Sequence, residues 1–442
     1  MKSADLGSNF AFRNCMKMKM TLAAALVVVA CSREEVREKT ADARQKVAEV
    51  TGFAAPLGQR DDPKQREQQR FDEQWRNLRS FREQQAQQAA RQVTEAQKQA
   101  QQAQMQAQQA QMQAPADIKF VTGAKETFTN LDPQAIDAMP VAVPITGDVS
   151  GPSVVKTQVY LDRLHFSVGV LDGRWGRNSA IATWWYQRSR DLEPTGAVDE
   201  ATFRRLAGEA GAVPAIVVHP LTEDDVKGPF ITMPEDVYDK AKLDCLCYET
   251  LTEKLAEKFH SSAEFLAILN PGVELNSLTA GQSINVPNVR EQTPKGGQPD
   301  ITRIVVSIQG NTLDAFNAAG ELVFHGPTTL GNKYDPSPRE ITQVARVAEA
   351  PRYHYQPKLF AEVHDSEPEA NLQPGPNSPV GVIWTALKKP HFGIHGTADP
   401  DSIGYASSHG CVRLTNWDAL EVGRRVAPGV PVEFLDTRGE KD

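Results

Sequence analysis

The sequence lacks a hydrophobic run that could cross a membrane, and it lacks a concentrated block of basic residues. A transmembrane helix needs about 20 apolar residues. The one candidate run, Leu22 to Ala30, is shorter and has the length typical of the apolar part of a secretory signal peptide. The formal net charge is −8, and Lys and Arg are not concentrated anywhere beyond the extreme N-terminus. Because nucleic acid binding needs a dense basic surface, we exclude nucleic acid as a partner.

The apolar run near the N-terminus ends at a cysteine. Lys17 and Lys19 precede the run, and Val28-Val29-Ala30-Cys31 closes it. This tetrapeptide resembles a bacterial lipobox, which implies that residues 1–30 are a signal peptide and that the Cys31 thiol becomes lipidated. The alternative is an ordinary signal peptide that ends near a cysteine. Ser32 after the cysteine favours the outer membrane of a Gram-negative bacterium, so we expect a lipid-anchored periplasmic protein. The true start codon stays open among Met16, Met18 and Met20.

Cysteine is also scarce, with five in 442 residues. Cys15 would be lost with the signal peptide and Cys31 would be lipidated, so three remain: Cys245, Cys247 and Cys411. Three thiols cannot all pair with one another, and a leftover thiol in an exported protein is a candidate for reactivity. Cys245 and Cys247 allow two half-buried thiols, a local bridge or half of a metal site. Of these we expect the two half-buried thiols.

The segment from Ser32 to about Ala114 has no apolar stripe at helical spacing. It is charged at first and then rich in Gln and Ala, which favour helices. A coiled coil needs apolar residues at its a and d positions, and these are missing. We therefore interpret residues 31–150 as a solvated helical or disordered tether that ends in a proline-containing linker over residues 115–150.

Residues 151–212 change to an apolar pattern at helical spacing. Two similar turns, Leu171–Gly176 and Glu193–Asp199, each lead into a helical pattern, and Asn178 and Asp199 are candidate N-caps. This arrangement resembles the three-helix peptidoglycan-binding module found beside cell-wall enzymes. The resemblance implies a wall-binding domain; the alternative is a small helical bundle that only packs against its neighbours.

Residues 213–292 contain a linker and a second small module. Two short amphipathic helical patterns around Leu251–Phe259 and Phe265–Leu269 are followed by a strand pattern that ends at Pro287. This order resembles a LysM module, here of the form ααβ. The first strand of a LysM module is poorly formed, because Cys245 and Cys247 occupy its expected place, so glycan binding by this module stays open.

From Ile301 the sequence alternates between apolar and polar residues, as β-strands do. Ile304–Ile308 and Leu322–Phe324 are strand candidates separated by Gly and Asn turns, and one helix is expected from Trp417 to Val426. We predict a mostly antiparallel β domain over residues 300–436. The whole chain is then an α+β multidomain protein.

Two motifs in this last domain carry chemistry. The first is His391-Phe392-Gly393-Ile394-His395-Gly396-Thr397, and the second is Ser407-Ser408-His409-Gly410-Cys411-Val412-Arg413-Leu414. A cysteine needs a base or a cation beside it to become a nucleophile. The stretch of chain from His395 to Cys411 is long enough for a strand, a turn and a return, so the two side chains can lie on adjoining strands or loops. Backbone N–H groups around Gly410 and Cys411 could stabilise a tetrahedral oxyanion.

These motifs, together with Tyr334–Pro338 and Pro374–Gly381, resemble the L,D-transpeptidase (YkuD-like) catalytic domain. The resemblance implies that Cys411 is the nucleophile and His395 the general base, with the Gly396 carbonyl orienting the imidazole. It also implies that His409 shapes the site or assists protonation. It further implies that Arg413 holds the substrate carboxylate or the loop. We name Ser408 and Tyr355 with Arg413 as candidate substrate-binding residues.

The resemblance further implies an exported L,D-transpeptidase that forms an acyl-enzyme with a peptidoglycan stem peptide. The acceptor stays open: a stem amine would give a 3–3 crosslink, a lysine of an envelope lipoprotein would give protein anchoring, and water would make the enzyme a carboxypeptidase or amidase. A non-catalytic wall-binding lipoprotein is the rival from another class. No metal and no organic cofactor is implied, and the oligomeric state stays open.

Overall fold

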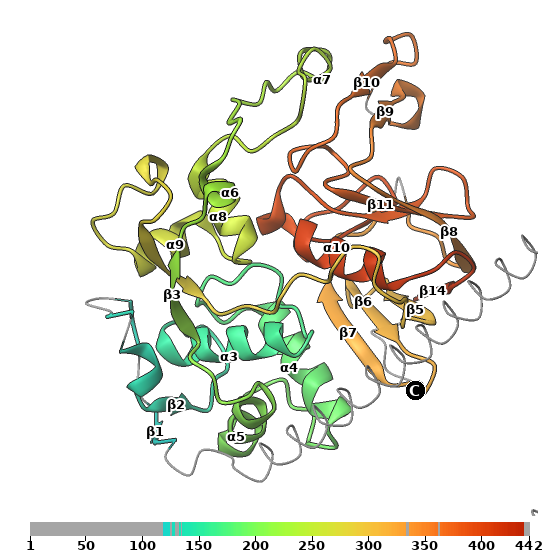
Figure 1. Ribbon diagram of the computed structural model, residues 1–442. Coiled ribbons are helices and arrows are strands. Elements are labelled where there is room, and N and C mark those ends of the chain that lie inside the picture. Colours follow the sequence, from blue (N-terminus) through green and yellow to red (C-terminus); the bar gives the residue numbers. More distant parts are fainter. Residues whose placement is uncertain are drawn as a thin grey trace, which may run out of the picture. The chain divides into compact units, whose positions relative to one another are not determined.

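The computed structural model describes residues 118–123, 126–128, 132–133, 135–332, 336–360 and 363–436 (Figure 1). The predicted signal peptide, the lipidation site at Cys31 and the Gln/Ala-rich tether lie outside these residues. Within the described part of the chain, no helix is long and apolar enough to cross a membrane. The confirmed fold class is α+β, with helices ahead of a C-terminal sheet.

A three-helix domain follows the N-terminal linker, in agreement with the sequence. Its core is apolar and includes the fully buried side chains of Tyr186 and Phe203. The Asp199 carboxylate accepts a hydrogen bond of 2.7 Å from Thr202 N and caps the third helix, as predicted. The prediction that Asn178 is an N-cap was wrong: Gly176 holds that position, and the Asn178 amide donates to Ile403 O of the C-terminal domain at 3.0 Å. The three helices are α3 (Pro152–Arg163), α4 (Arg177–Ser189) and α5 (Glu200–Glu209), preceded by β1 (Phe120–Thr122), η1 (Ile136–Ala138) and β2 (Val141–Val143).

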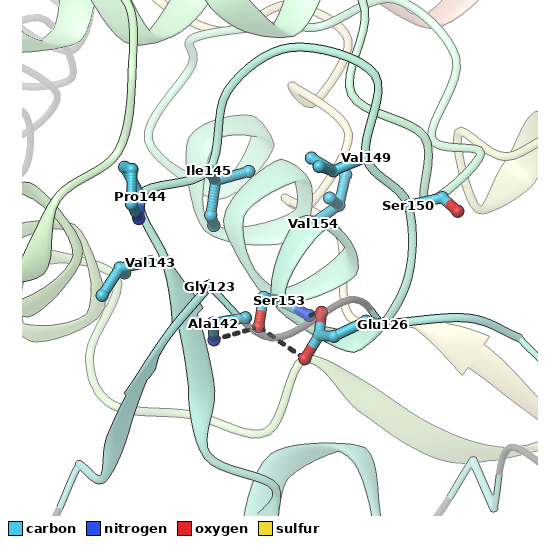
Figure 2. Close-up of a pocket in the computed structure, with 10 residues that line it drawn as sticks. All are labelled: Gly123, Glu126, Ala142, Val143, Pro144, Ile145, Val149, Ser150, Ser153 and Val154. Carbon is cyan, nitrogen blue, oxygen red and sulfur yellow. Dashed lines mark hydrogen bonds between the residues drawn. The ribbon is translucent and has the colours of Figure 1, made fainter.

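The start of α3 is capped from the preceding linker. The Glu126 carboxylate accepts hydrogen bonds of 2.8 Å from both Ser153 N and Ser153 Oγ, and Ser153 Oγ in turn accepts one from Ala142 N (Figure 2). A carboxylate beside a helix N-terminus also complements the helix dipole. Glu126 therefore ties the linker to the three-helix domain.

The next module is βααβ rather than ααβ. Its first strand, β3 (Ile216–Pro220), pairs antiparallel with β4 (Ser283–Pro287), and α8 (Leu251–Lys258) and α9 (Ala263–Leu269) lie between them in sequence. The sequence analysis placed the first strand too late, at Cys245 and Cys247, because an insertion separates β3 from α8. That insertion, residues 221–250, carries α6 (Glu223–Val226) and α7 (Val237–Lys240); η2 (Leu275–Ser277) precedes β4.

Cys245 and Cys247 lie in this insertion and form a disulfide, which corrects the expectation of two half-buried thiols. Their Cα atoms are 5.2 Å apart, within the range that a disulfide can bridge. Leu246 between them is fully buried, and its N–H donates to Pro374 O at 3.1 Å. The insertion is thereby docked on a loop of the C-terminal domain.

The C-terminal domain is built on an eight-stranded, mostly antiparallel sheet with the order β13-β12-β11-β8-β14-β5-β6-β7 (Figure 1). Only the β12–β13 and β14–β5 pairs are parallel. Helix α10 (Asn416–Arg425) packs on the sheet at β11 and β12, and a separate β9–β10 hairpin lies beside the insertion. The elements are β5 (Arg303–Ser307), β6 (Thr312–Phe316), β7 (Leu322–Pro327), β8 (Ile341–Glu349), β9 (Tyr353–Tyr355), η3 (Pro357–Leu359), β10 (Ala370–Leu372), β11 (Ile383–Leu387), β12 (Gly393–His395), η4 (Pro400–Ser402), β13 (Val412–Arg413) and β14 (Pro431–Leu435).

A buried ion cluster joins the three modules. Arg290 contacts the carboxylates of Asp162, from α3, and Asp418, from α10, and His260 Nδ1 lies 2.9 Å from Asp162. Desolvation alone would raise the pKa of Asp162, but Arg290 and His260 outweigh it and lower that pKa to about 2. The His260 ring also stacks on Trp417 at 5.0 Å. This cluster locks helical, βααβ and sheet modules against one another.

Candidate active site

The two chemical motifs meet at one edge of the sheet. Strand β12 ends at His395, and β13 begins directly after Cys411. The two strands pair in parallel, with His395 opposite Arg413. Parallel pairing requires the chain between the two strands to cross over, and the segment between the two motifs supplies that crossover. Since Ile394 lies opposite Val412, Cys411 lies beside Gly393 at the start of β12, directly before the outermost strand of the sheet.

His395 is buried, with 3% of its surface exposed, and its ring is held on two sides. Nδ1 lies 2.6 Å from Gly396 O, and a carbonyl can only accept, so Nδ1 carries the hydrogen and Nε2 is the basic nitrogen. The ring stacks on Trp384 of β11, with centroids 5.2 Å apart and planes 24° apart. Desolvation lowers the pKa of His395 to about 3, so the ring is neutral at ordinary pH.

Cys411 is the free thiol among the described cysteines, and it is half-buried. Its Sγ lies 3.5 Å from His391 O, which can accept the S–H hydrogen. Desolvation raises the pKa of the thiol, outweighing the opposing effects of the Gly393 backbone and of Arg413. The resting site therefore holds a neutral thiol and a neutral imidazole, so attack requires proton transfer to a base.

The loop before Cys411 is shaped by two serine hydroxyls. Ser408 Oγ donates to Cys411 O at 2.7 Å and accepts from Gly410 N at 3.2 Å. Ser337 Oγ donates to Gly410 O at 2.8 Å. Ser408 is buried, and its hydroxyl forms hydrogen bonds within the loop. In the structure it therefore stabilises the loop, whereas the sequence suggested that it contacts the substrate. Ser337 lies in the Tyr334–Pro338 motif, but the sequence did not indicate that it contacts Gly410.

Gly410 has a backbone conformation that favours glycine. Its φ is +101°, and a Cβ at this position would lie 2.8 Å from the Phe392 ring. Both the left-handed backbone and the close ring exclude larger residues. Because Gly410 N–H donates to Ser408 Oγ, the N–H of Cys411 is the candidate donor of this turn for a tetrahedral oxyanion.

Arg413 and Tyr353 are the polar groups whose charges act on the thiol. Burial lowers the pKa of Arg413, and the charges of Cys411 and Tyr353 are the largest effects that raise it. Burial likewise raises the pKa of Tyr353 to about 12, with the thiolate charge of Cys411 the next cause. Within the described residues, the buried Nε of Arg413 has no hydrogen-bond partner. Arg413 was predicted from the sequence and Tyr353 was not. The alternation in Tyr353-His354-Tyr355 puts the two tyrosines on one face of β9.

Tyr355, on β9, and His409, in the loop before Cys411, belong to one series of aromatic contacts. The Tyr355 ring contacts Tyr238 of the insertion at 6.3 Å and Phe360 at 5.2 Å. His409 is exposed, and its ring meets Phe360 edge-on at 4.9 Å. These aromatic contacts connect the insertion of the βααβ module, through Tyr355 and Phe360, to the loop before Cys411. Among the described residues, no group of three or more His, Cys, Asp or Glu side chains is arranged to hold a metal ion.

Comparison with known proteins agrees with this geometry. The profile of the L,D-transpeptidase catalytic domain (YkuD) matches residues 301–434, and that of a peptidoglycan binding domain matches residues 150–206. The L,D-transpeptidase YkuD of Bacillus licheniformis is 34% identical over 188 residues, which cover 42% of this chain and 93% of the relative. The corresponding protein of Bacillus subtilis is 30% identical over 182 residues, covering 40% of this chain and 89% of the relative. The chain therefore belongs to the L,D-transpeptidase family.

A more distant relative is L,D-transpeptidase YbiS of Escherichia coli, 28% identical over 189 residues that cover 42% of this chain and 60% of the relative. Among solved structures, L,D-transpeptidase 3 of Mycobacterium tuberculosis has 15% identity, a TM-score of 0.26, and coverage of 36% of this chain and 76% of that chain. The catalytic and peptidoglycan-binding domains together support an L,D-transpeptidase whose substrate is peptidoglycan.

Proposed function

We propose that the protein transfers the acyl group of a peptidoglycan stem peptide through a thioester on Cys411. The observation that carries this proposal is the placement of a half-buried thiol directly before β13 and of a buried imidazole at the end of the adjacent strand β12, with the imidazole Nδ1–H anchored on Gly396 O. That anchor leaves Nε2 as the basic nitrogen, which is the form a general base requires.

In the first half-reaction Cys411 attacks the carbonyl of the third residue of a tetrapeptide stem. The S–H proton passes to His395 Nε2 as the S–C bond forms, and the backbone N–H of Cys411 donates to the oxyanion. The C–N bond to the terminal D-Ala then breaks, and the leaving amine takes the proton from His395. The products are a thioester and free D-Ala.

In the second half-reaction an acceptor amine attacks the thioester. His395 accepts a proton from that amine, the C–S bond breaks, and the thiolate regains the proton. An acceptor amine from another stem gives a 3–3 crosslink, and a lysine of an envelope protein gives an anchored protein. Arg413 suits a stem carboxylate, because its guanidinium is largely buried near the thiol and its Nε has no partner among the described residues.

The experiment incubates purified protein with tetrapeptide muropeptides and follows the products by mass spectrometry. Dimers formed with loss of D-Ala support stem-to-stem transfer, and tripeptides alone indicate water as the acceptor. Unchanged muropeptides in the presence of a reactive Cys411 exclude free stems as donors and contradict the proposal.

We also propose that the enzyme is exported and lipid-anchored at Cys31 in the periplasm, on the evidence of the Val28–Cys31 pattern after an apolar run. Growth with a labelled fatty acid tests this: the label should appear on the protein and disappear in Cys31→Ser. Equal labelling of both proteins would contradict lipidation at this residue.

Glycan binding by residues 213–292 is a further proposal of the same kind. It is supported by the βααβ order, with β3 and β4 paired and two helices between them. Sedimentation of the purified protein with sacculi should weaken when exposed residues of this module are changed. Unchanged sedimentation would leave the helical domain as the wall-binding part.

A further inference from the structure

The carboxylate of Glu257, in the βααβ module, reaches the C-terminal domain at the point where the catalytic imidazole is anchored. Glu257 lies on α8, and its Oε2 accepts a hydrogen bond of 2.9 Å from Asn416 Nδ2 at the start of α10. Its Oε1 accepts one of 2.8 Å from Tyr248 OH in the insertion. The residue as a whole is half-buried, but desolvation of its carboxyl group raises its pKa to about 7.

Both polar atoms of the Asn416 side chain form hydrogen bonds, and the residue is nearly inaccessible, with 1% exposure. Besides Glu257, its Nδ2 donates to Pro376 O at 3.1 Å, and its Oδ1 accepts from Val382 N at 3.2 Å. The amide thus connects α8, the loop before β11 and the start of α10. Such a fully satisfied buried amide has one preferred orientation.

That orientation bears directly on Gly396. A Cβ on Gly396 would lie 2.0 Å from Asn416 Oδ1, and a Cβ on Gly381 would lie 2.0 Å from the same oxygen. Asn416 Oδ1 therefore packs directly against the backbones of Gly396 and Gly381, which also lie close to each other. Since Gly396 O holds His395 Nδ1 at 2.6 Å, the position of the Asn416 amide fixes the carbonyl that sets the imidazole tautomer.

We infer that Glu257 and Asn416 are positioning residues for His395, so that the βααβ module is a working part of the active site and not only a wall-binding attachment. This inference rests on the proposed role of His395 as the base. The chain of contacts runs from Glu257 through Asn416 and Gly396 to His395 Nδ1. The sequence could not indicate it, because Glu257 and His395 lie far apart along the chain and belong to different modules.

The test compares Glu257→Ala with Glu257→Gln and with a control, Glu264→Ala. Glutamine can accept from Asn416 and donate to Tyr248, so it preserves both contacts. Glu264 is an exposed glutamate on α9, with 75% of its side chain accessible and a pair to Arg174 of 3.6 Å. We expect Glu257→Ala to lower kcat by roughly 10- to 100-fold, as loss of an orienting contact does, with KM within about twofold. Glu257→Gln and Glu264→Ala should stay close to wild type.

A second readout separates this inference from the proposed function. In full-length protein with ¹⁵N-labelled histidine, His395 should show the Nδ1–H tautomer in wild type and Glu257→Gln, and a mixture of tautomers in Glu257→Ala. An unchanged tautomer and unchanged kcat in folded Glu257→Ala would overturn the inference. If instead the wild type shows the tautomer but no transpeptidation, the proposed function fails and the positioning still stands.

Discussion

The indole of Trp384 and the imidazole of His395 are stacked, with centroids 5.2 Å apart, across the β11–β12 pair in which these two residues are opposite each other. The aromatic face removes water from one side of the base, and the Gly396 carbonyl fixes its tautomer on the other. Desolvation keeps the ring neutral, although the Gly396 contact opposes that effect, and the same contact holds the hydrogen on Nδ1 so that Nε2 is the basic nitrogen. A neutral ring leaves no imidazolium to stabilise a thiolate, and this has a measurable consequence.

The first prediction concerns the reactivity of Cys411. Because burial raises the thiol pKa and lowers that of His395 to about 3, the fraction of thiolate at pH 7 is small. Alkylation of Cys411 by iodoacetamide, quantified on the Cys411 peptide by mass spectrometry, should rise about tenfold per pH unit and continue to rise past pH 9. A plateau below pH 7 would instead show a thiolate–imidazolium pair at rest.

A second prediction concerns the turn before the thiol. Gly410→Ala introduces a Cβ at φ +101° against Phe392, and we expect at least about a tenfold loss of kcat because the oxyanion donor shifts. Gly429→Ala is the matched control: its φ is +94°, but no atom lies within 4 Å of the new Cβ. Both variants should lose roughly 1–2 kcal/mol of stability through backbone strain. Equal activity in the two variants would show that the Gly410 turn is not part of the catalytic machinery.

A third prediction concerns the cluster that joins the modules. Arg290→Met leaves Asp162 and Asp418 buried without their common cation, which should lower the free energy of unfolding by about 3–5 kcal/mol. Arg303→Met removes a partly exposed pair with Glu433 at 3.5 Å and should cost at most about 1 kcal/mol. Urea denaturation measures both variants. Similar small losses would mean that the modules are held together by apolar packing alone.

A fourth prediction uses the raised pKa of Glu257. An acid whose pKa is higher in the folded state binds more protons there than when unfolded, so its contribution to stability is complete below its unfolded pKa. That contribution is lost as the pH rises from about 4.5 through about 7. The stability of wild type relative to Glu257→Gln should therefore fall across this range, measured as the difference in Tm at pH 4.5 and pH 8. A difference that does not change with pH would place the Glu257 pKa near its ordinary value.

Much of the fold could be predicted because local patterns were strong. Asp199 caps its helix as expected, since an aspartate before a helical pattern acts on its own neighbours. The first strand of the βααβ module was missed, because β3 pairs with a strand that is distant in sequence and the insertion between β3 and α8 breaks the module pattern. The Cys245–Cys247 disulfide was also missed, since the sequence does not show that the chain brings these thiols into bonding geometry around buried Leu246.

The candidate site, too, could be predicted only in part from the sequence. Cys411, His395, Gly396 and Gly410 lie within two short motifs, and the structure brings them to one sheet edge. The residues that hold them come from elsewhere: Ser337 from an earlier loop, Trp384 from β11 and Glu257 from another module. Contacts of this kind depend on tertiary packing, and no local pattern in one sequence predicts them.

Intact-protein mass spectrometry shows whether Cys411 carries the acyl group. Wild-type protein, Cys411→Ala and Cys245→Ser/Cys247→Ser are each incubated with a tetrapeptide stem and, separately, with a carbapenem. We expect wild type and the double variant to gain one adduct that maps to Cys411 and to release D-Ala, and Cys411→Ala to do neither while remaining folded. Release of D-Ala by folded Cys411→Ala, or an adduct on another residue, would contradict the account.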